Sequence, residues 1–138
     1  MAVELSDQST ASELALVRTL AASHDAVIVG AFVRAASGSD RLDLAPGVVD
    51  LLNDLSRDTA RRNQPLVAAF FGSPYAAVAA ATLPTALVTY DLGDYAESAA
   101  VRALAGEIAL MGTLPVTLSE QLPVGFGLKR PGPATQGR

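Results

Sequence analysis

Two uninterrupted apolar runs most constrain what this chain can fold into. Residues 25–33 read DAVIVGAFV and residues 64–72 read QPLVAAFFG. Runs of this length without alternating polar residues are typical of strands buried on both faces. Between them, residues 48–63 carry Val and Leu at helical spacing, which predicts a helix with an apolar face. A strand, a helix and a second strand in this order predict a parallel sheet within an α/β fold.

The remaining segments extend this alternation. We expect further strands at 2–5, 85–90 and 114–118, and further helices over about 10–22, from Pro74 onward, and over 96–112 with an end at Gly112. Thr10 or Ser12 is expected to cap the first of these helices. We therefore predict a flavodoxin-like, three-layer α/β/α sandwich with a mostly parallel sheet. It forms a single domain over 1–128, followed by a disordered tail over 129–138.

Composition excludes several classes of function. With no Cys and a single His among 138 residues, thiol chemistry and disulfides are ruled out, and a metal site is not expected. A net charge of -4 with no Trp argues against nucleic-acid binding. No apolar stretch approaches the ~20 residues of a membrane span, and no export signal is recognised, so the compartment is left open. No glycine-rich nucleotide motif follows a strand, so no cofactor is expected.

The loops after parallel strands meet at one edge of a sheet, where ligands bind. The residues expected at that edge are Arg34, Gly72, Ser73, Tyr75, Tyr90 and Asp91. An arginine there can pair with a carboxylate or hydrogen-bond sugar hydroxyls, and a tyrosine can stack on a sugar or fill an interface pocket. Packing against another domain is the simpler role for each of them.

The stretch FFGSPYAAV raises the question of whether Ser73 is a nucleophile. The hydrolase elbow has the pattern Gly-x-Ser-x-Gly, and the stretch around Ser73 lacks the second glycine. His24 precedes a strand of about seven residues, which separates it from Ser73 by roughly 20 Å. Ser73 is therefore expected to cap the helix that starts at Pro74, and His24 to end the preceding one. The loop acids Asp40, Asp43, Asp91 and Asp94 remain candidates for a general acid/base pair, Asp94 also for a helix cap. No residue is assigned as catalytic.

Several stretches together resemble the C-terminal domain of glycoside hydrolase family 3, in its bacterial β-N-acetylhexosaminidase branch. They are DAVIVGAFVRAASGSDRLDL, QPLVAAFFGSPY, TALVTYDLGDYAESAAVRALAGEIALMGTLPVTL and LPVGFGL, which cover about residues 25–128 in the family's order. The resemblance implies an α/β/α sandwich beside a TIM barrel that carries the catalytic aspartate and is absent here. It also implies that the family's first β-α unit is missing. Glu107 falls within an expected helix and matches no catalytic glutamate of the family.

The resemblance implies a non-catalytic accessory domain of a β-N-acetylglucosaminidase-like protein, with a TIM-barrel glycosidase domain and carbohydrate as partners. Two alternatives remain open. The chain is a stand-alone module that binds a small ligand or protein and pairs with a second copy of itself, or it is a weak glycosidase or esterase that uses loop carboxylates. Whether the chain alone is an enzyme is left undecided.

Overall fold

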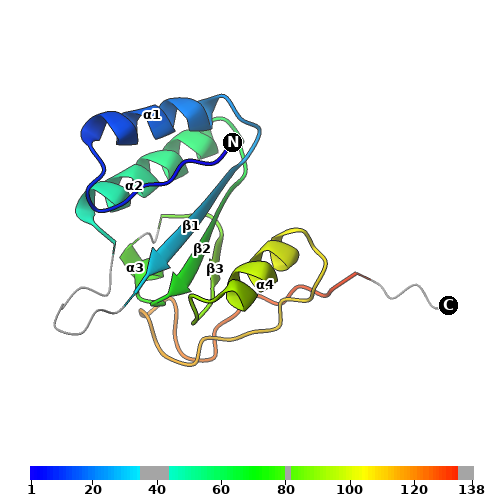
Figure 1. Cartoon of the computed structure of the whole chain (residues 1–138). Helices are drawn as coiled ribbons and strands as arrows, with labels where there is room; N and C mark the ends of the chain where they lie inside the picture. The colour runs from blue at the N-terminus through cyan, green and yellow to red at the C-terminus, as the bar shows by residue number, and fades with distance from the viewer. Residues whose placement is uncertain (35–43, 80–81, 134–138) are drawn as a thin grey trace.

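The computed structural model describes residues 1–34, 44–79 and 82–133. The elements follow one another as helix α1 (Ala11–Ala22), strand β1 (Val27–Val33), helix α2 (Pro46–Arg61), strand β2 (Leu66–Gly72), helix α3 (Ala76–Ala79), strand β3 (Ala86–Val88) and helix α4 (Asp94–Leu104). Strands and helices alternate as the sequence predicts, and the chain is an α/β protein (Figure 1).

The strands form a parallel sheet in the order β1-β2-β3. Residues 27–33 of β1 pair one to one with residues 66–72 of β2, and residues 68–70 of β2 pair with residues 86–88 of β3. Strand β2 is therefore central and β1 is an edge strand. Within the described ranges, no strand pairs with the outer side of β1.

Helices α1 and α2 cover one face of the sheet (Figure 1). The leucine face predicted for α2 is buried, since Leu51, Leu52 and Leu55 are at most 3% exposed. Leu52 packs with Phe70 of β2, while Leu51 and Leu55 pack with Leu66. These contacts form the main core, and they fix α2 against the central strand.

Helix α4 covers the opposite face, so the protein has the three layers of an α/β/α sandwich (Figure 1). Ala100 of α4 packs on Ala69 and Phe71 of β2. This cover does not extend to β1, where Ile28 is 68% and Phe32 56% exposed. The Phe32 ring instead stacks on Phe71, with ring centroids 4.6 Å apart. One strip of the sheet thus remains open on the α4 side.

Helix α1 begins with the cap that the sequence predicts. The Thr10 hydroxyl accepts a hydrogen bond from the Glu13 backbone N–H at 3.3 Å, and the Thr10 backbone N–H donates to the Glu13 carboxylate at 2.6 Å. This reciprocal capping box satisfies donors that the first turn leaves free. The hydrogen bonds from Thr10 also lower the pKa of Glu13, because they favour the ionised carboxylate.

The end of α4 corrects one prediction. The helix stops at Leu104 rather than Gly112, because Gly106 adopts φ +80°. The Gly106 N–H donates to the Ala103 carbonyl and the Glu107 N–H to the Arg102 carbonyl, at 3.1 and 2.8 Å. This is a Schellman motif, in which a left-handed glycine closes a helix. Glu107 therefore lies just beyond the helix, where its carboxylate pairs with Arg102 at 3.2 Å.

Two predicted strands do not form. Residues 2–5 belong to no strand and form no hydrogen bond with a described residue. Residues 114–118 belong to an irregular hairpin instead, in which Leu114 bonds to Phe126 and Gly125, and Leu118 bonds to Leu122. Strand propensity alone does not make a strand without a neighbour to pair with.

The same hairpin reaches into the segment predicted to be a disordered tail. Arg130 exchanges two backbone hydrogen bonds with Leu110, both 2.8 Å long. Its guanidinium also donates to the Ala103 carbonyl at the end of α4. Residues 134–138 of the predicted tail lie outside the described residues.

Candidate functional site

The carboxyl ends of the strands lie together at one edge of the sheet, as a parallel arrangement requires. Val33 at the end of β1 is the register partner of Gly72 at the end of β2, and Val88 of β3 is that of Phe70. Tyr90 follows β3 by two residues. The edge predicted from the sequence therefore exists, and its loops come from neighbouring strands.

A shallow hollow of about 370 Å³ opens at this edge. Its lining comprises Val33, Gly72, Ser73, Pro74, Tyr75, Tyr90 and Leu92. Four of the six predicted edge residues thus share one surface: Gly72, Ser73, Tyr75 and Tyr90. Sequence reasoning missed Leu92 and Val33, whose apolar character resembled that of ordinary core positions.

Gly72 makes the close approach of β1 and β2 possible at the floor of this hollow. Its φ is +84°, a conformation that side chains with a Cβ rarely adopt. A Cβ built on Gly72 would lie 2.3 Å from the Val33 carbonyl oxygen and 3.1 Å from Leu92 Cγ. The next residue, Ser73, donates its backbone N–H to that same carbonyl at 3.1 Å. The turn out of β2 therefore depends on a glycine at this position.

Two half-exposed tyrosines line the hollow. Tyr75 is 45% and Tyr90 48% exposed, which leaves part of each ring available to a partner. Thr89 holds the strand end beneath Tyr90, because its N–H donates to the Phe70 carbonyl at 2.8 Å and its hydroxyl to the Asp91 carbonyl at 3.0 Å. Partial burial raises the pKa of Tyr90, so its phenol stays protonated and able to donate a hydrogen bond.

The carboxylate of Asp91 organises the backbone of its own loop. It accepts the N–H groups of Leu92 at 2.6 Å and Gly93 at 3.0 Å, which fixes the entry into α4. Gly93 is the N-cap residue and no side chain caps this helix, so the suggested capping role of Asp94, the first helical residue, is wrong. Asp91 thus has a structural role at the edge of the hollow.

The remaining predicted residues lie apart from the hollow. Arg34 directly follows β1, is exposed, and does not line the hollow. The loop acids Asp40 and Asp43 lie outside the described residues. Helix α3 begins at Ala76, so the helix expected to start at Pro74 starts two residues later and Ser73 is not adjacent to it.

The position of His24 argues against a hydrolytic Ser-His pair. His24 precedes the amino end of β1, whereas Ser73 follows the carboxyl end of β2. The paired strands are seven residues long, which separates their ends by about 20 Å. The Nδ1 atom of His24 instead donates to the Leu20 carbonyl at 2.8 Å, at the carboxyl end of α1. His24 therefore serves the helix end that the sequence predicts for it.

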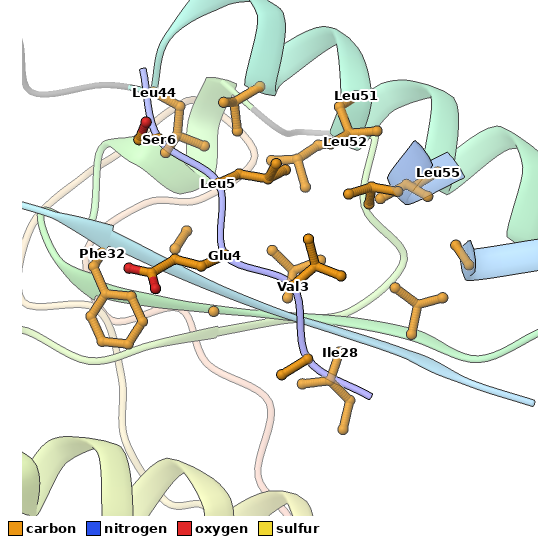
Figure 2. A pocket seen from close by; sticks show the side chains of 18 of the residues that line it. Val3, Glu4, Leu5, Ser6, Ile28, Phe32, Leu44, Leu51, Leu52 and Leu55 are labelled. Atoms are coloured by element: carbon orange, nitrogen blue, oxygen red, sulfur yellow. The ribbon is translucent and has the colours of Figure 1, made fainter. Parts of the chain in front are cut away.

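A second, larger hollow of about 1140 Å³ was not foreseen from the sequence. The N-terminal segment, residues 1–7, bounds it together with β1 and the apolar faces of α1 and α2. Figure 2 shows the segment passing from beside Ile28 toward Leu44, with Leu51 and Leu55 of α2 near the same space. Arg34 lines this hollow.

The described residues contain neither a metal-binding cluster nor a membrane-spanning helix. In the part of the chain that the structure describes, no group of three or more His, Asp or Glu side chains could hold a metal ion. No helix within the described ranges is long and apolar enough to cross a membrane.

Fold and site together define an α/β protein with an open carboxyl edge. No family model, curated protein or solved structure significantly matches the chain.

Proposed function

We propose that this chain is a non-catalytic accessory domain of a family 3 glycoside hydrolase-like protein of the β-N-acetylglucosaminidase type. The carboxyl edge of its sheet packs beside the active site of a TIM-barrel domain. The observation that supports this proposal best is the shared hollow of Gly72, Ser73, Tyr75 and Tyr90. Half-exposed tyrosines over an apolar floor are typical of interface anchors.

The chemistry available at this edge favours docking over catalysis. The Asp91 carboxylate already accepts two backbone N–H groups. The imidazole of His24 lies at the opposite end of the strands. Glycoside hydrolysis needs two carboxyl groups across one bond. Among the described residues, the acids that follow β3 before or at the start of α4 are Asp91 and Asp94, and neither lines the hollow. A weak glycosidase or esterase is therefore the less supported alternative.

The proposal predicts that a TIM barrel is encoded in frame immediately upstream of this chain's coding region, and this barrel provides the test. The barrel would be expressed separately, and its affinity for the purified chain measured by biolayer interferometry. A Tyr75→Ala/Tyr90→Ala double variant should bind at least about tenfold more weakly, since buried interface tyrosines typically contribute above 1 kcal/mol each. Leu16→Ala, an exposed position on α1, should leave the affinity unchanged.

Three results would contradict the proposal. They are the absence of an upstream barrel, equal affinities of the double variant and the wild type, or hydrolysis of a chromogenic N-acetyl-β-glucosaminide by the chain alone that Asp91→Ala abolishes. The last result would support the catalytic alternative directly.

A further inference from the structure

Part of the wall of the carboxyl-edge hollow belongs to the loop between β3 and α4. Tyr90 and Leu92 of this loop line the hollow, whereas Asp91 between them does not. Asp91 is exposed, and its carboxylate accepts two hydrogen bonds from the backbone of its own loop. The acid in the middle of this loop therefore bonds to the loop backbone without entering the hollow.

A run of hydrogen bonds leads through the loop from β2 toward α4. The Thr89 N–H donates to a β2 carbonyl at 2.8 Å, and the Thr89 hydroxyl donates to the Asp91 carbonyl at 3.0 Å. The second of these bonds spans Tyr90. Beyond it, the Asp91 Oδ1 atom accepts the N–H groups of Leu92 at 2.6 Å and Gly93 at 3.0 Å. The carboxylate thus fixes the half of the loop that the Thr89 hydroxyl does not reach.

The two side chains of this wall are restrained to different degrees. Leu92 packs on the buried cluster between α4 and β2, and its side chain lies next to Gly72. Tyr90 is 48% exposed, so packing restrains it less. The place of the Tyr90 ring therefore depends more on the loop backbone on either side of it.

A carboxylate suits the task of holding this backbone. Hydrogen bonds to a carboxylate are about twice as strong as those between neutral groups, and an Asp side chain that bonds the backbone one and two residues on stabilises a turn. A surface that is ordered before its partner arrives loses less conformational entropy on docking. Order in this loop therefore contributes to affinity even where the ordering group touches no partner.

We propose that Asp91 is a positioning residue for the docking surface. Its two backbone hydrogen bonds hold Tyr90 and Leu92 in the arrangement that the partner meets, and the carboxylate itself does not touch the partner. The inference rests on the proposed function, since the partner is the TIM-barrel domain that docks at the carboxyl edge. It gives the acid of this edge a role in the order of two neighbouring side chains rather than in acid/base chemistry or sugar binding.

The first measurement uses the full chain without its partner. Asp91→Ala removes both acceptor bonds, so amide hydrogen exchange at Leu92 and Gly93 should become at least about tenfold faster. Asp91→Asn keeps an acceptor oxygen and should restore most of the protection. Exchange of the amides of β2 should stay unchanged, which separates a loosened loop from a weakened fold.

The second measurement is the affinity for the barrel domain, by biolayer interferometry. Asp91→Ala should weaken binding at least about fivefold, because the side chains of Tyr90 and Leu92 must then be ordered on docking. Asp91→Asn should bind nearly as well as the wild type. Asp94→Ala is the matched control: Asp94 is the exposed first residue of α4 and accepts neither loop bond, so its loss should change neither exchange nor affinity.

A double-mutant cycle separates positioning from direct contact. If Asp91 acts through Tyr90, Asp91→Ala should weaken binding by a smaller factor in a Tyr90→Ala background than in the wild-type chain. A carboxylate that touches the barrel would give the same factor in both backgrounds.

Four results would overturn the proposal. They are unchanged exchange at Leu92 and Gly93 in Asp91→Ala, failure of Asp91→Asn to restore protection and affinity, equal factors in the two backgrounds, and an equal loss of affinity in Asp94→Ala. A wild-type chain that does not bind the barrel, with exchange rates as expected, would instead refute the docking function and support Asp91 as the residue that orders this wall of the hollow.

Discussion

Gly72→Ala should destabilise the fold far more than a single added methyl group suggests. The left-handed φ of +84° costs a residue with a Cβ about 1–2 kcal/mol. The new Cβ would also lie 2.3 Å from the Val33 oxygen, so the oxygen must move and weaken the bond it accepts from Ser73, worth about 1 kcal/mol. Displacing Leu92 adds about 1–2 kcal/mol of overpacking. The expected loss of unfolding free energy is about 4 kcal/mol.

Gly106→Ala provides the matched control. Gly106 has nearly the same φ, +80°, but a Cβ there would meet only the end of the Arg130 side chain at 3.5 Å. Its expected cost is therefore the conformational part alone, about 1–2 kcal/mol. Urea unfolding followed by circular dichroism measures both variants. If Gly72→Ala is no less stable than Gly106→Ala, the approach of β1 and β2 does not depend on the missing side chain, and the reasoning fails.

Two further predictions concern the core and the site. Leu51→Ala should cost about 2–5 kcal/mol of unfolding free energy, because Leu51 is 1% exposed. Leu16 is 54% exposed, so Leu16→Ala should change the unfolding free energy by less than about 0.5 kcal/mol. Equal effects of the two substitutions would contradict the assigned core. Burial raises the pKa of Tyr90 above the ordinary tyrosine value of 10.0, so the unfolded chain ionises first and stability should fall as pH rises above 10. Unfolding midpoints across this pH range should show a smaller decline in Tyr90→Phe, and an identical decline would refute the assignment.

The buried strands could be predicted because their information is local. An unbroken run such as residues 27–33 or 66–72 has few alternatives to a buried strand, and the leucines of α2 repeat at helical spacing. The Schellman end of α4 was also visible in principle, since Gly106 follows the last apolar turn. Gly112 is an equally plausible helix end in the sequence, and the local pattern does not decide between the two glycines.

The carboxyl edge could be predicted in outline but not in detail. Because parallel strands share one direction, the sequence placed Gly72 and Tyr90 at the same edge of the sheet, and both line the hollow. No local pattern shows that Leu92 lies against Gly72, or that residues 2–5 do not pair with a described strand. Such features depend on how segments that are distant in the sequence pack together. The residues of one segment alone do not specify that packing.

The strand order β1-β2-β3 follows the chain order, and this has a consequence for synthesis on the ribosome. Each new strand can pair with the strand made just before it, so the sheet can grow as the chain emerges. The outer edge of β1 gains no described partner at any step. Ile28 and Phe32 therefore stay exposed on nascent and finished chains alike, and crowded translation would favour edge-to-edge aggregation there. Lysine at Ile28 should raise the soluble yield without disturbing the core.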